Sequence, residues 1–217
     1  MKKIMFNDKY GLTQAVLEGR KTMTRRIIKP DPTTVQPINT RIDENGNCWE
    51  TRVYPTEFGG GEYEVFAASI SKNCSPYKID EVIAISQNYG TIAAEMMVGD
   101  YDYDLYEKFR QLAMGMKLNG NSNKIFVRAD LMPHHIKIVK IKVERLQCIS
   151  DDDCLKEEIN EDSKGIQYSF SSNIGYCGQY PFDTPREAFA ALIDRVSGKG
   201  IWERNPFVWV YEFELIN

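Results

Sequence analysis

The segment 207–216 constrains the fold more than any other part of the chain. Read as an extended strand, it has two apolar faces, made of Phe207, Trp209, Tyr211, Phe213 and Leu215 on one side and of Val208 and Val210 on the other. A strand that is apolar on both faces is typical of a sheet interior, because both faces must be covered. We therefore expect a central strand here, with the remaining sheet built around it.

Other segments predict further strands from their β-branched and alternating residues. These segments are 22–28, 79–86 and 136–146. The region 31–76 contains prolines, glycine-rich turns and spaced aromatic residues, which predict two or three irregular strands.

Helices are predicted where capping signals meet apolar residues at helical spacing. Thr184 begins a capping box with Pro185 at the first helical position, and the helix is expected to stop at Gly198. Ser150 begins a short acidic helix, and two more helices are expected at 12–18 and at about 103–116. Strands and helices are segregated along the chain, which favours an α+β domain around a small, mostly antiparallel sheet or barrel.

Charge is distributed unevenly along the 217 residues. The total is 27 Lys and Arg against 31 Asp and Glu, a net charge of −4, which argues against indiscriminate binding to phosphate backbones. Residues 1–30 nevertheless hold eight cations and two acids. No apolar run approaches the roughly 18 residues that cross a bilayer, and no signal-peptide apolar region follows Met1, so we expect a cytoplasmic protein that does not bind membranes.

The cysteines and histidines give no indication of a metal site or of a cofactor. Five cysteines occur without a Cys-x-x-Cys motif, and the two histidines, His134 and His135, are adjacent. Neighbouring residues on a strand point to opposite faces, which is unsuited to a shared metal. We expect reduced thiols, no metal and no cofactor.

The densest cluster of polar chemistry is the segment 19–26, Gly-Arg-Lys-Thr-Met-Thr-Arg-Arg, directly after the first predicted helix. Arginine offers a bidentate fork, and threonine a short donor and acceptor, so the segment suits a phosphate or a planar polar ligand. A solvated basic surface is the other interpretation of the same residues.

This cluster carries a resemblance to a known family. Segment 17–26 resembles the opening signature of the ASCH family, whose domains are PUA-like and related to RNA-binding modules. Segments 77–83 and 142–150 resemble the strand that follows in that family and the strand leading into its acidic helix. Segment 200–213 is similar to the tail of phage and prophage members. Together these blocks cover about half of the chain.

The resemblance implies a single ASCH, PUA-like domain over residues 1–217, with a pseudo-barrel of strands and flanking helices. Regions 31–76 and 89–128 match little of the family and are expected to be insertions. The family cleft would form where the Gly-Arg-Lys-Thr segment meets the acidic helix.

The resemblance also implies candidate catalytic residues. Some small bacterial members are amidohydrolases that remove the acyl group from N4-acetylcytidine with a Lys, a Thr and a Glu, and these match Lys21, Thr24 and Glu157. In such a set the amine deprotonates the hydroxyl, and the carboxylic acid protonates the departing amine. Two points are open from the residues alone. Lys21 and Thr24 have opposite parity on a regular strand, and a helical wheel turns Glu158 inward more than Glu157.

Three functions are compatible with these residues. The first is binding of RNA, a nucleotide or a modified base through a set of cationic and stacking candidates: Arg20, Lys21, Arg25, Arg26 and His134. His134 is included because it lies in a Met-Pro-His-His segment where relatives carry Met-Pro-Arg-Trp. The second is hydrolysis of an N4-acylated cytidine by Lys21, Thr24 and Glu157. The third is a phage accessory protein with a vestigial cleft.

Overall fold

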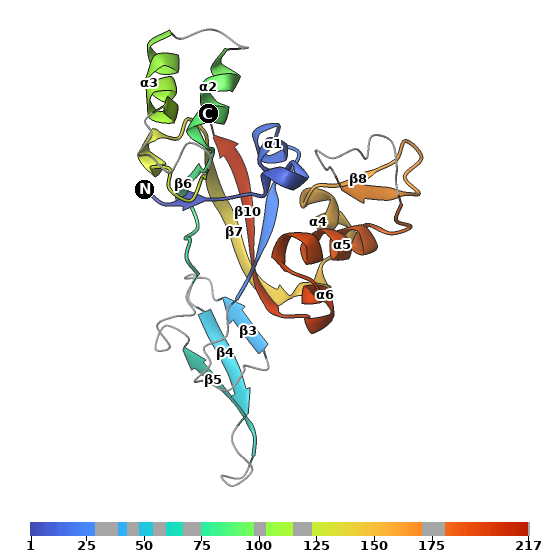
Figure 1. The fold of residues 1–217 in the computed structure, drawn as a ribbon. Coiled ribbons are helices and arrows are strands. Elements are labelled where there is room, and N and C mark those ends of the chain that lie inside the picture. Colours follow the sequence, from blue (N-terminus) through green and yellow to red (C-terminus); the bar gives the residue numbers. More distant parts are fainter. Residues whose placement is uncertain are drawn as a thin grey trace.

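A computed structural model describes residues 1–28, 39–42, 48–53, 60–66, 75–97, 103–114, 123–170 and 181–216. Its centre is a five-stranded sheet in the order β1-β6-β7-β10-β2 (Figure 1). The strands of this sheet are β1 (Lys3–Ile4), β2 (Met23–Ile27), β6 (Val82–Ile85), β7 (His135–Arg145) and β10 (Phe207–Ile216). β1 and β6 are parallel and the other neighbours are antiparallel. The predicted α+β class and mostly antiparallel sheet are confirmed, but the described strands do not close into a barrel.

β10 occupies the interior position that its sequence predicts. It pairs with β2 on one side and with β7 on the other, and its residues from Phe207 to Tyr211 are all buried. The pairing of β10 with β7 is irregular between Glu212 and Phe213, where the register shifts. At the same point the backbone N–H of Phe213 donates to the carbonyl of Thr22, 2.9 Å away. β2 therefore enters the sheet beside an irregularity in its neighbour.

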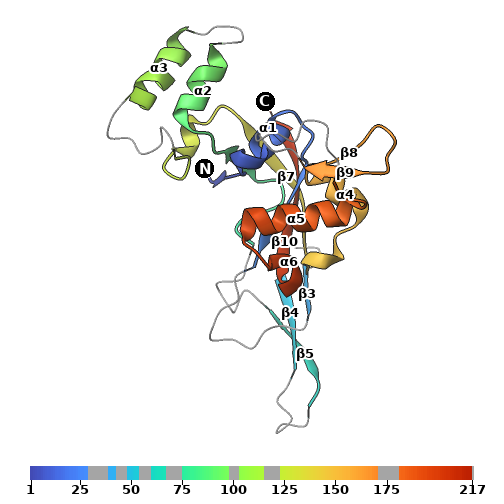
Figure 2. The same cartoon turned by 45° about the vertical axis from the view of Figure 1, so that its right-hand side comes forward.

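Helices pack on one side of this sheet around the main hydrophobic core (Figure 2). They are α4 (Asp151–Lys156), α5 (Pro185–Ser197) and α6 (Ile201–Arg204), while α1 (Leu12–Leu17) precedes β2. The predicted caps are present, since the side chains of Ser150 and Thr184 accept backbone N–H bonds at the starts of α4 and α5. α5 directs Phe189, Leu192 and Ile193 into the core.

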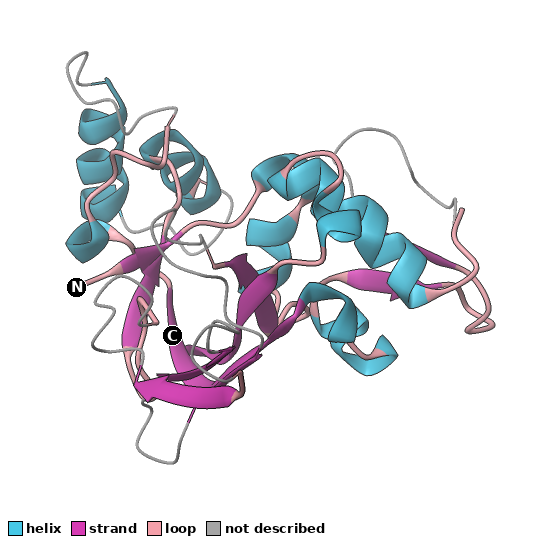
Figure 3. Cartoon of the chain, turned by 90° about the horizontal axis from the view of Figure 1, so that it is seen from below, coloured by secondary structure: helices cyan, strands magenta, loops and turns pink. Residues whose placement is uncertain are grey.

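A second, smaller core holds a pair of helices, α2 (Tyr89–Met96) and α3 (Tyr103–Met114), at the other end of the sheet (Figure 3). α3 matches its predicted position, whereas α2 is not predicted from the sequence. Gly90 and Thr91 weaken the helical pattern of α2, and its first turn is stabilised by the side chain of Asn88. None of the described helices combines the length and the apolar character that crossing a bilayer requires.

Two smaller sheets complete the described structure. β3 (Asn39–Ile42), β4 (Cys48–Val53) and β5 (Glu62–Phe66) form an antiparallel sheet, which confirms the strands predicted within 31–76. β8 (Ile159–Glu161) pairs with β9 (Tyr168–Phe170) directly after α4. Whether regions 31–76 and 89–128 are insertions into a family domain remains a prediction.

Candidate functional site

A pocket of about 270 Å³ lies between β2, the segment before α1, and α5. Its polar lining contains Lys21, Thr24, Arg25, Arg26 and Glu157. Its apolar lining includes Met5 and Phe6 from the N-terminal segment and Phe189, Leu192, Ile193 and Val196 from α5. All three predicted catalytic residues therefore line one pocket, although they come from distant parts of the sequence.

Lys21 reaches this pocket from a turn that precedes β2. Gly19 adopts a left-handed backbone (φ +73°), and the N–H of Lys21 then donates to the carbonyl of Ala15 over 3.0 Å. The Lys21 side chain is only 2% exposed, and its Nζ donates to Oε2 of Glu157 over 2.5 Å and to the Glu157 carbonyl over 3.1 Å. Because Lys21 lies before the strand, its parity relative to Thr24 does not constrain it.

Burial lowers the pKa of the Lys21 ammonium below its ordinary value. The charge of Glu157 and its hydrogen bond act in the opposite direction without cancelling this effect, and Arg26 adds to the lowering. Lys21 thus loses its proton more readily than an exposed lysine does, which is what a general base requires.

Glu157 points into the pocket because α4 ends just before it. The helix stops at Lys156, Glu157 is its C-terminal cap, and Glu158 follows with a left-handed backbone (φ +78°). This reversal separates the two carboxylates, so Glu158 forms an ion pair with Arg20 and does not line the pocket. The helical wheel that favours Glu158 does not apply, since neither residue lies within the helix.

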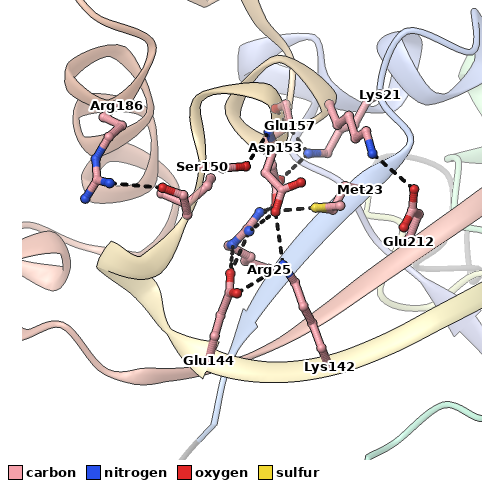
Figure 4. Close-up of polar contacts among 12 residues, drawn as sticks. Lys21, Met23, Arg25, Lys142, Glu144, Ser150, Asp153, Glu157, Arg186 and Glu212 are labelled. Atoms are coloured by element: carbon pink, nitrogen blue, oxygen red, sulfur yellow. Dashed lines mark hydrogen bonds and ion pairs between the residues drawn. The ribbon is translucent and has the colours of Figure 1, made fainter.

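Arg25 holds the other oxygen of Glu157 and belongs to a buried network of charges. Its side chain is fully buried, and its guanidinium contacts Glu144 at 2.6 Å, Asp153 at 2.8 Å and Glu157 at 3.2 Å (Figure 4). Lys142 also contacts two of these carboxylates, those of Glu144 and Asp153. Burial acts to lower the pKa of Arg25, but the carboxylates around it hold that pKa above its usual value.

The three acids around Arg25 hold its guanidinium in a fixed orientation. Arg25 supplies several donors in a planar fork, and each carboxylate that it contacts fixes the orientation of the guanidinium. Burying such charges is tolerated only when they are paired and hydrogen-bonded. Arg25 therefore orients Glu157 and is not free to contact phosphate from the surface.

Thr24 supplies the hydroxyl of the pocket. It lies on β2 opposite Tyr211 of β10, and it is 5% exposed. Its hydroxyl makes no hydrogen bond to any residue in the described ranges, in contrast to the Thr13 hydroxyl, which donates to Asp8. A buried hydroxyl with no partner among these residues is available to a molecule that enters the pocket.

Arg26 follows Arg25 on β2 and therefore points to the opposite face of the strand. One Nη2 hydrogen bond to the Met5 carbonyl, at 2.5 Å, holds its guanidinium over the ring of Phe6. Its Nε is enclosed and has no hydrogen-bond partner in the part of the chain that the structure describes. Burial lowers the pKa of Arg26.

Two of the predicted nucleic-acid-binding residues lie away from the pocket lining. Arg20 is partly exposed and contacts Glu18 and Glu158. His134 directly precedes β7, whereas Thr24 pairs with Tyr211, which in turn pairs with Ile141 in the middle of β7. Burial, followed by the charge of His135, lowers the pKa of His134. Of that predicted set, Lys21, Arg25 and Arg26 line the pocket.

Sequence reasoning missed the contribution of the pocket walls and of the charge network. Phe6 precedes the first helix without any motif, and the inward face of α5 reads only as core. One feature of the sequence could have pointed to Glu144 and Asp153, since both acids lie close to the predicted start of the acidic helix.

A scan against protein-family models, a search of curated proteins and a search of solved structures found no match to this chain.

Proposed function

We propose that this protein hydrolyses the amide bond of a small N-acylated substrate of the N4-acetylcytidine class. The observation that carries the proposal is the contact between Lys21 Nζ and Glu157 Oε2, 2.5 Å, in a pocket that the side chain of Thr24 also lines, with no hydrogen bond from its hydroxyl to a described residue. A base, a nucleophile and an acid are the three groups that such a reaction needs.

The short contact provides both proton-transfer groups at once. Moving the single shared proton from Lys21 Nζ to Glu157 Oε2 converts an ammonium and a carboxylate into an amine and a carboxylic acid. The overall charge of the pair does not change. Burial favours the amine form of Lys21, because a low-dielectric environment penalises the charged ammonium more than the neutral amine.

Acylation of Thr24 follows from these protonation states. The Lys21 amine accepts the Thr24 hydroxyl proton while Oγ forms a bond to the acyl carbon of the substrate. The C–N bond then breaks, and the Glu157 carboxylic acid gives its proton to the departing amine nitrogen. The products of this step are the free amine, an acyl ester on Thr24, a Lys21 ammonium and a Glu157 carboxylate.

Hydrolysis of the ester restores the site. The Glu157 carboxylate accepts a proton from a water molecule, whose oxygen forms a bond to the acyl carbon. The bond from that carbon to Thr24 Oγ breaks, and the Lys21 ammonium returns a proton to Oγ. The acyl group leaves as a carboxylic acid, which loses its proton to water, and the neutral pair of Lys21 and Glu157 is regenerated.

The size of the pocket favours a small substrate. Its volume of about 270 Å³ lies just below the roughly 300–1,000 Å³ that ligand sites usually span. A single modified nucleoside suits such a site better than a longer RNA segment. The resemblance of segment 17–26 to the ASCH signature supports the same substrate class, and we propose a PUA-like, ASCH-type domain on that basis.

Binding of a nucleotide or modified base without hydrolysis is the second candidate. It is favoured by the same ion pair, because a carboxylate 2.5 Å from Lys21 stabilises the ammonium, which donates hydrogen bonds but is no base. In that case Lys21, Arg26 and Thr24 would recognise the polar groups of a base or ribose.

The experiment is incubation of the purified protein with N4-acetylcytidine, with cytidine and acetate measured by chromatography. We expect hydrolysis by the wild type, its loss in Thr24→Val, and a decrease of about 10²–10⁴-fold in Lys21→Met. Thr91→Ala and Lys199→Ala alter exposed residues outside the pocket and serve as matched controls. Hydrolysis that persists in both site variants would contradict the assignment. Binding of cytidine or RNA without acetate release would favour the second candidate.

A further inference from the structure

Two consecutive arginines on β2 have opposite electrostatic surroundings. Arg25 contacts three carboxylates, whereas Arg26 makes one hydrogen bond, to a backbone carbonyl, and no ion pair with any described residue. The Nε of Arg26 is enclosed and has no acceptor within the described ranges. The wall of the pocket therefore contains one cation whose charge is balanced by the network and one whose charge is not.

Leaving such a cation unpaired is costly. A buried donor without an acceptor loses its bonds to water and gains none in return, and this penalty is larger for a charged group than for a neutral one. Arg26 as a whole is partly buried, and desolvation of its enclosed end lowers its pKa. An arginine at a pocket wall without an ion-pair partner among the described residues is accordingly prepared for an anionic partner from outside them.

The position of Arg26 relative to Thr24 indicates where that partner forms. The two residues are separated by one position on β2, so their side chains emerge from the same face of the strand, with Cα atoms about 6–7 Å apart. Both line the pocket, and the charge of Arg26 acts on Lys21 and on Glu157. Arg26 thus belongs to the same electrostatic environment as the three proposed reacting groups.

We propose that Arg26 binds the oxyanion that forms on the acyl oxygen when Thr24 attacks. As Oγ bonds to the acyl carbon, the electron pair of the C=O π bond moves to oxygen, and Arg26 N–H groups donate to that negative oxygen. When the C–N bond breaks, the pair returns to re-form the carbonyl. This inference rests on the proposed function and adds a fourth catalytic residue to it.

This role predicts a specific kinetic signature. The substrate carbonyl is neutral and its oxygen becomes charged only in the transition state, so Arg26 stabilises the transition state more than the bound substrate. Loss of Arg26 should then lower kcat and leave KM nearly constant. An arginine that instead holds a fixed anion of the substrate, such as a carboxylate or phosphate, would mainly affect KM.

The test measures kcat and KM for N4-acetylcytidine in the wild type, Arg26→Gln and Arg26→Lys. We expect kcat to fall by about 10²–10³-fold in Arg26→Gln with KM changed less than about threefold. Added guanidinium ion should restore part of the Arg26→Gln rate and none of the Thr24→Val rate, a result that a purely structural role would not give. Arg204→Gln, on an exposed arginine of α6, is the matched control.

The outcomes separate this inference from the proposed function. Wild-type activity that depends on Thr24, with kcat unchanged in Arg26→Gln, would overturn the role of Arg26 and leave the hydrolase intact. A rise in KM alone would also overturn it and indicate binding of a fixed anion. Absence of hydrolysis by the wild type would overturn both. If Arg26→Gln does not fold, Arg26→Ala with guanidinium rescue provides the same comparison, and an Arg26→Ala rate that guanidinium ion does not raise counts against the proposal.

Discussion

Lys21 and Glu157 are separated by 136 positions in the sequence, yet the Nζ of one lies 2.5 Å from the Oε2 of the other. Both side chains are almost fully buried, at 2% and 6% exposed. The turn after α1 and the end of α4 bring them together, and the backbone N–H of Thr22 donates to the carbonyl of Lys156 beside them over 3.1 Å. The pair therefore links two distant segments of the chain and lines the pocket.

The two halves of this pair should differ in their contribution to stability. Glu157 retains Arg25 when Lys21 is removed, whereas Lys21 has no other acidic contact at ion-pair distance among the described residues. We expect Glu157→Leu to lower the free energy of unfolding by about 3–5 kcal/mol, because it leaves a buried, unpaired lysine. Lys21→Met should cost less. Urea unfolding monitored by circular dichroism measures both values.

The double variant Lys21→Met, Glu157→Leu completes this comparison. Replacing a buried ion pair by apolar residues is often neutral, so the double variant should be more stable than Glu157→Leu alone. It should remain inactive towards N4-acetylcytidine. Costs of the two single changes that simply add would show that the residues do not interact.

Removal of Arg25 should destabilise the protein through repulsion among the acids that remain. Arg25→Met leaves Glu144, Asp153 and Glu157 without their shared cation, and we expect a loss of about 3–5 kcal/mol at neutral pH. Asp153 is held in its charged form by Arg25 and Lys142, against the effect of burial, so that its pKa in the wild type is lowered. The wild type therefore loses stability as the pH falls through that pKa, while protonation relieves the variant. The difference between the two should shrink below about pH 4. Unfolding midpoints across pH 3–8 measure it, and a constant difference would contradict the interpretation.

The pH dependence of hydrolysis should reflect Lys21. The active form of the proposed site holds one proton for the pair, so kcat/KM should fall as rising pH removes that proton, along a limb whose midpoint lies below the ordinary lysine pKa of about 10.4. Glu157→Gln removes the acid, so its residual activity should instead rise with pH as Lys21 becomes neutral, with a midpoint at lower pH because Glu157 raises the pKa of Lys21 in the wild type. A wild-type kcat/KM that keeps rising through this pH range would contradict the shared-proton mechanism.

The cysteines beside the site should differ in reactivity. Cys154 on α4 is buried, and burial raises the pKa of its thiol to about 12, whereas Cys148 is exposed. Alkylation requires the thiolate, so iodoacetamide at pH 8 should modify Cys148 well before Cys154 in the folded protein. Peptide mass spectrometry measures both rates, and urea should equalise them. Equal rates in the folded state would show that α4 opens readily.

The sequence predicted the framework of the site better than its chemistry. β10 and α5 were predictable because their apolar patterns and the Thr184 cap are local signals. Whether Glu157 or Glu158 faces the pocket was not, because the end of α4 is decided by a left-handed residue, Glu158, that carries no glycine signal. The two carboxylates diverge because the backbone changes direction at Glu158, and helical periodicity cannot predict such a change.

The different roles of Arg25 and Arg26 also lay beyond local patterns. Both residues belong to one basic run, and only the arrangement of β7 and α4 around β2 places Glu144 and Asp153 against Arg25. Long-range pairing of this kind depends on the topology of the sheet. The open shape of the sheet is a further case, since strand patterns alone are compatible with either a closed or an open arrangement.

β2 is the last strand of its sheet, and the pocket-lining part of α5 and the segment around Glu157 lie against it. An outer strand with free backbone groups invites pairing with other chains and, ultimately, aggregation. The proposed catalytic residues thus also help to cover the edge strand β2. Substitutions that empty this region would be expected to reduce solubility together with turnover, which restricts how far the site can change while the protein stays monodisperse.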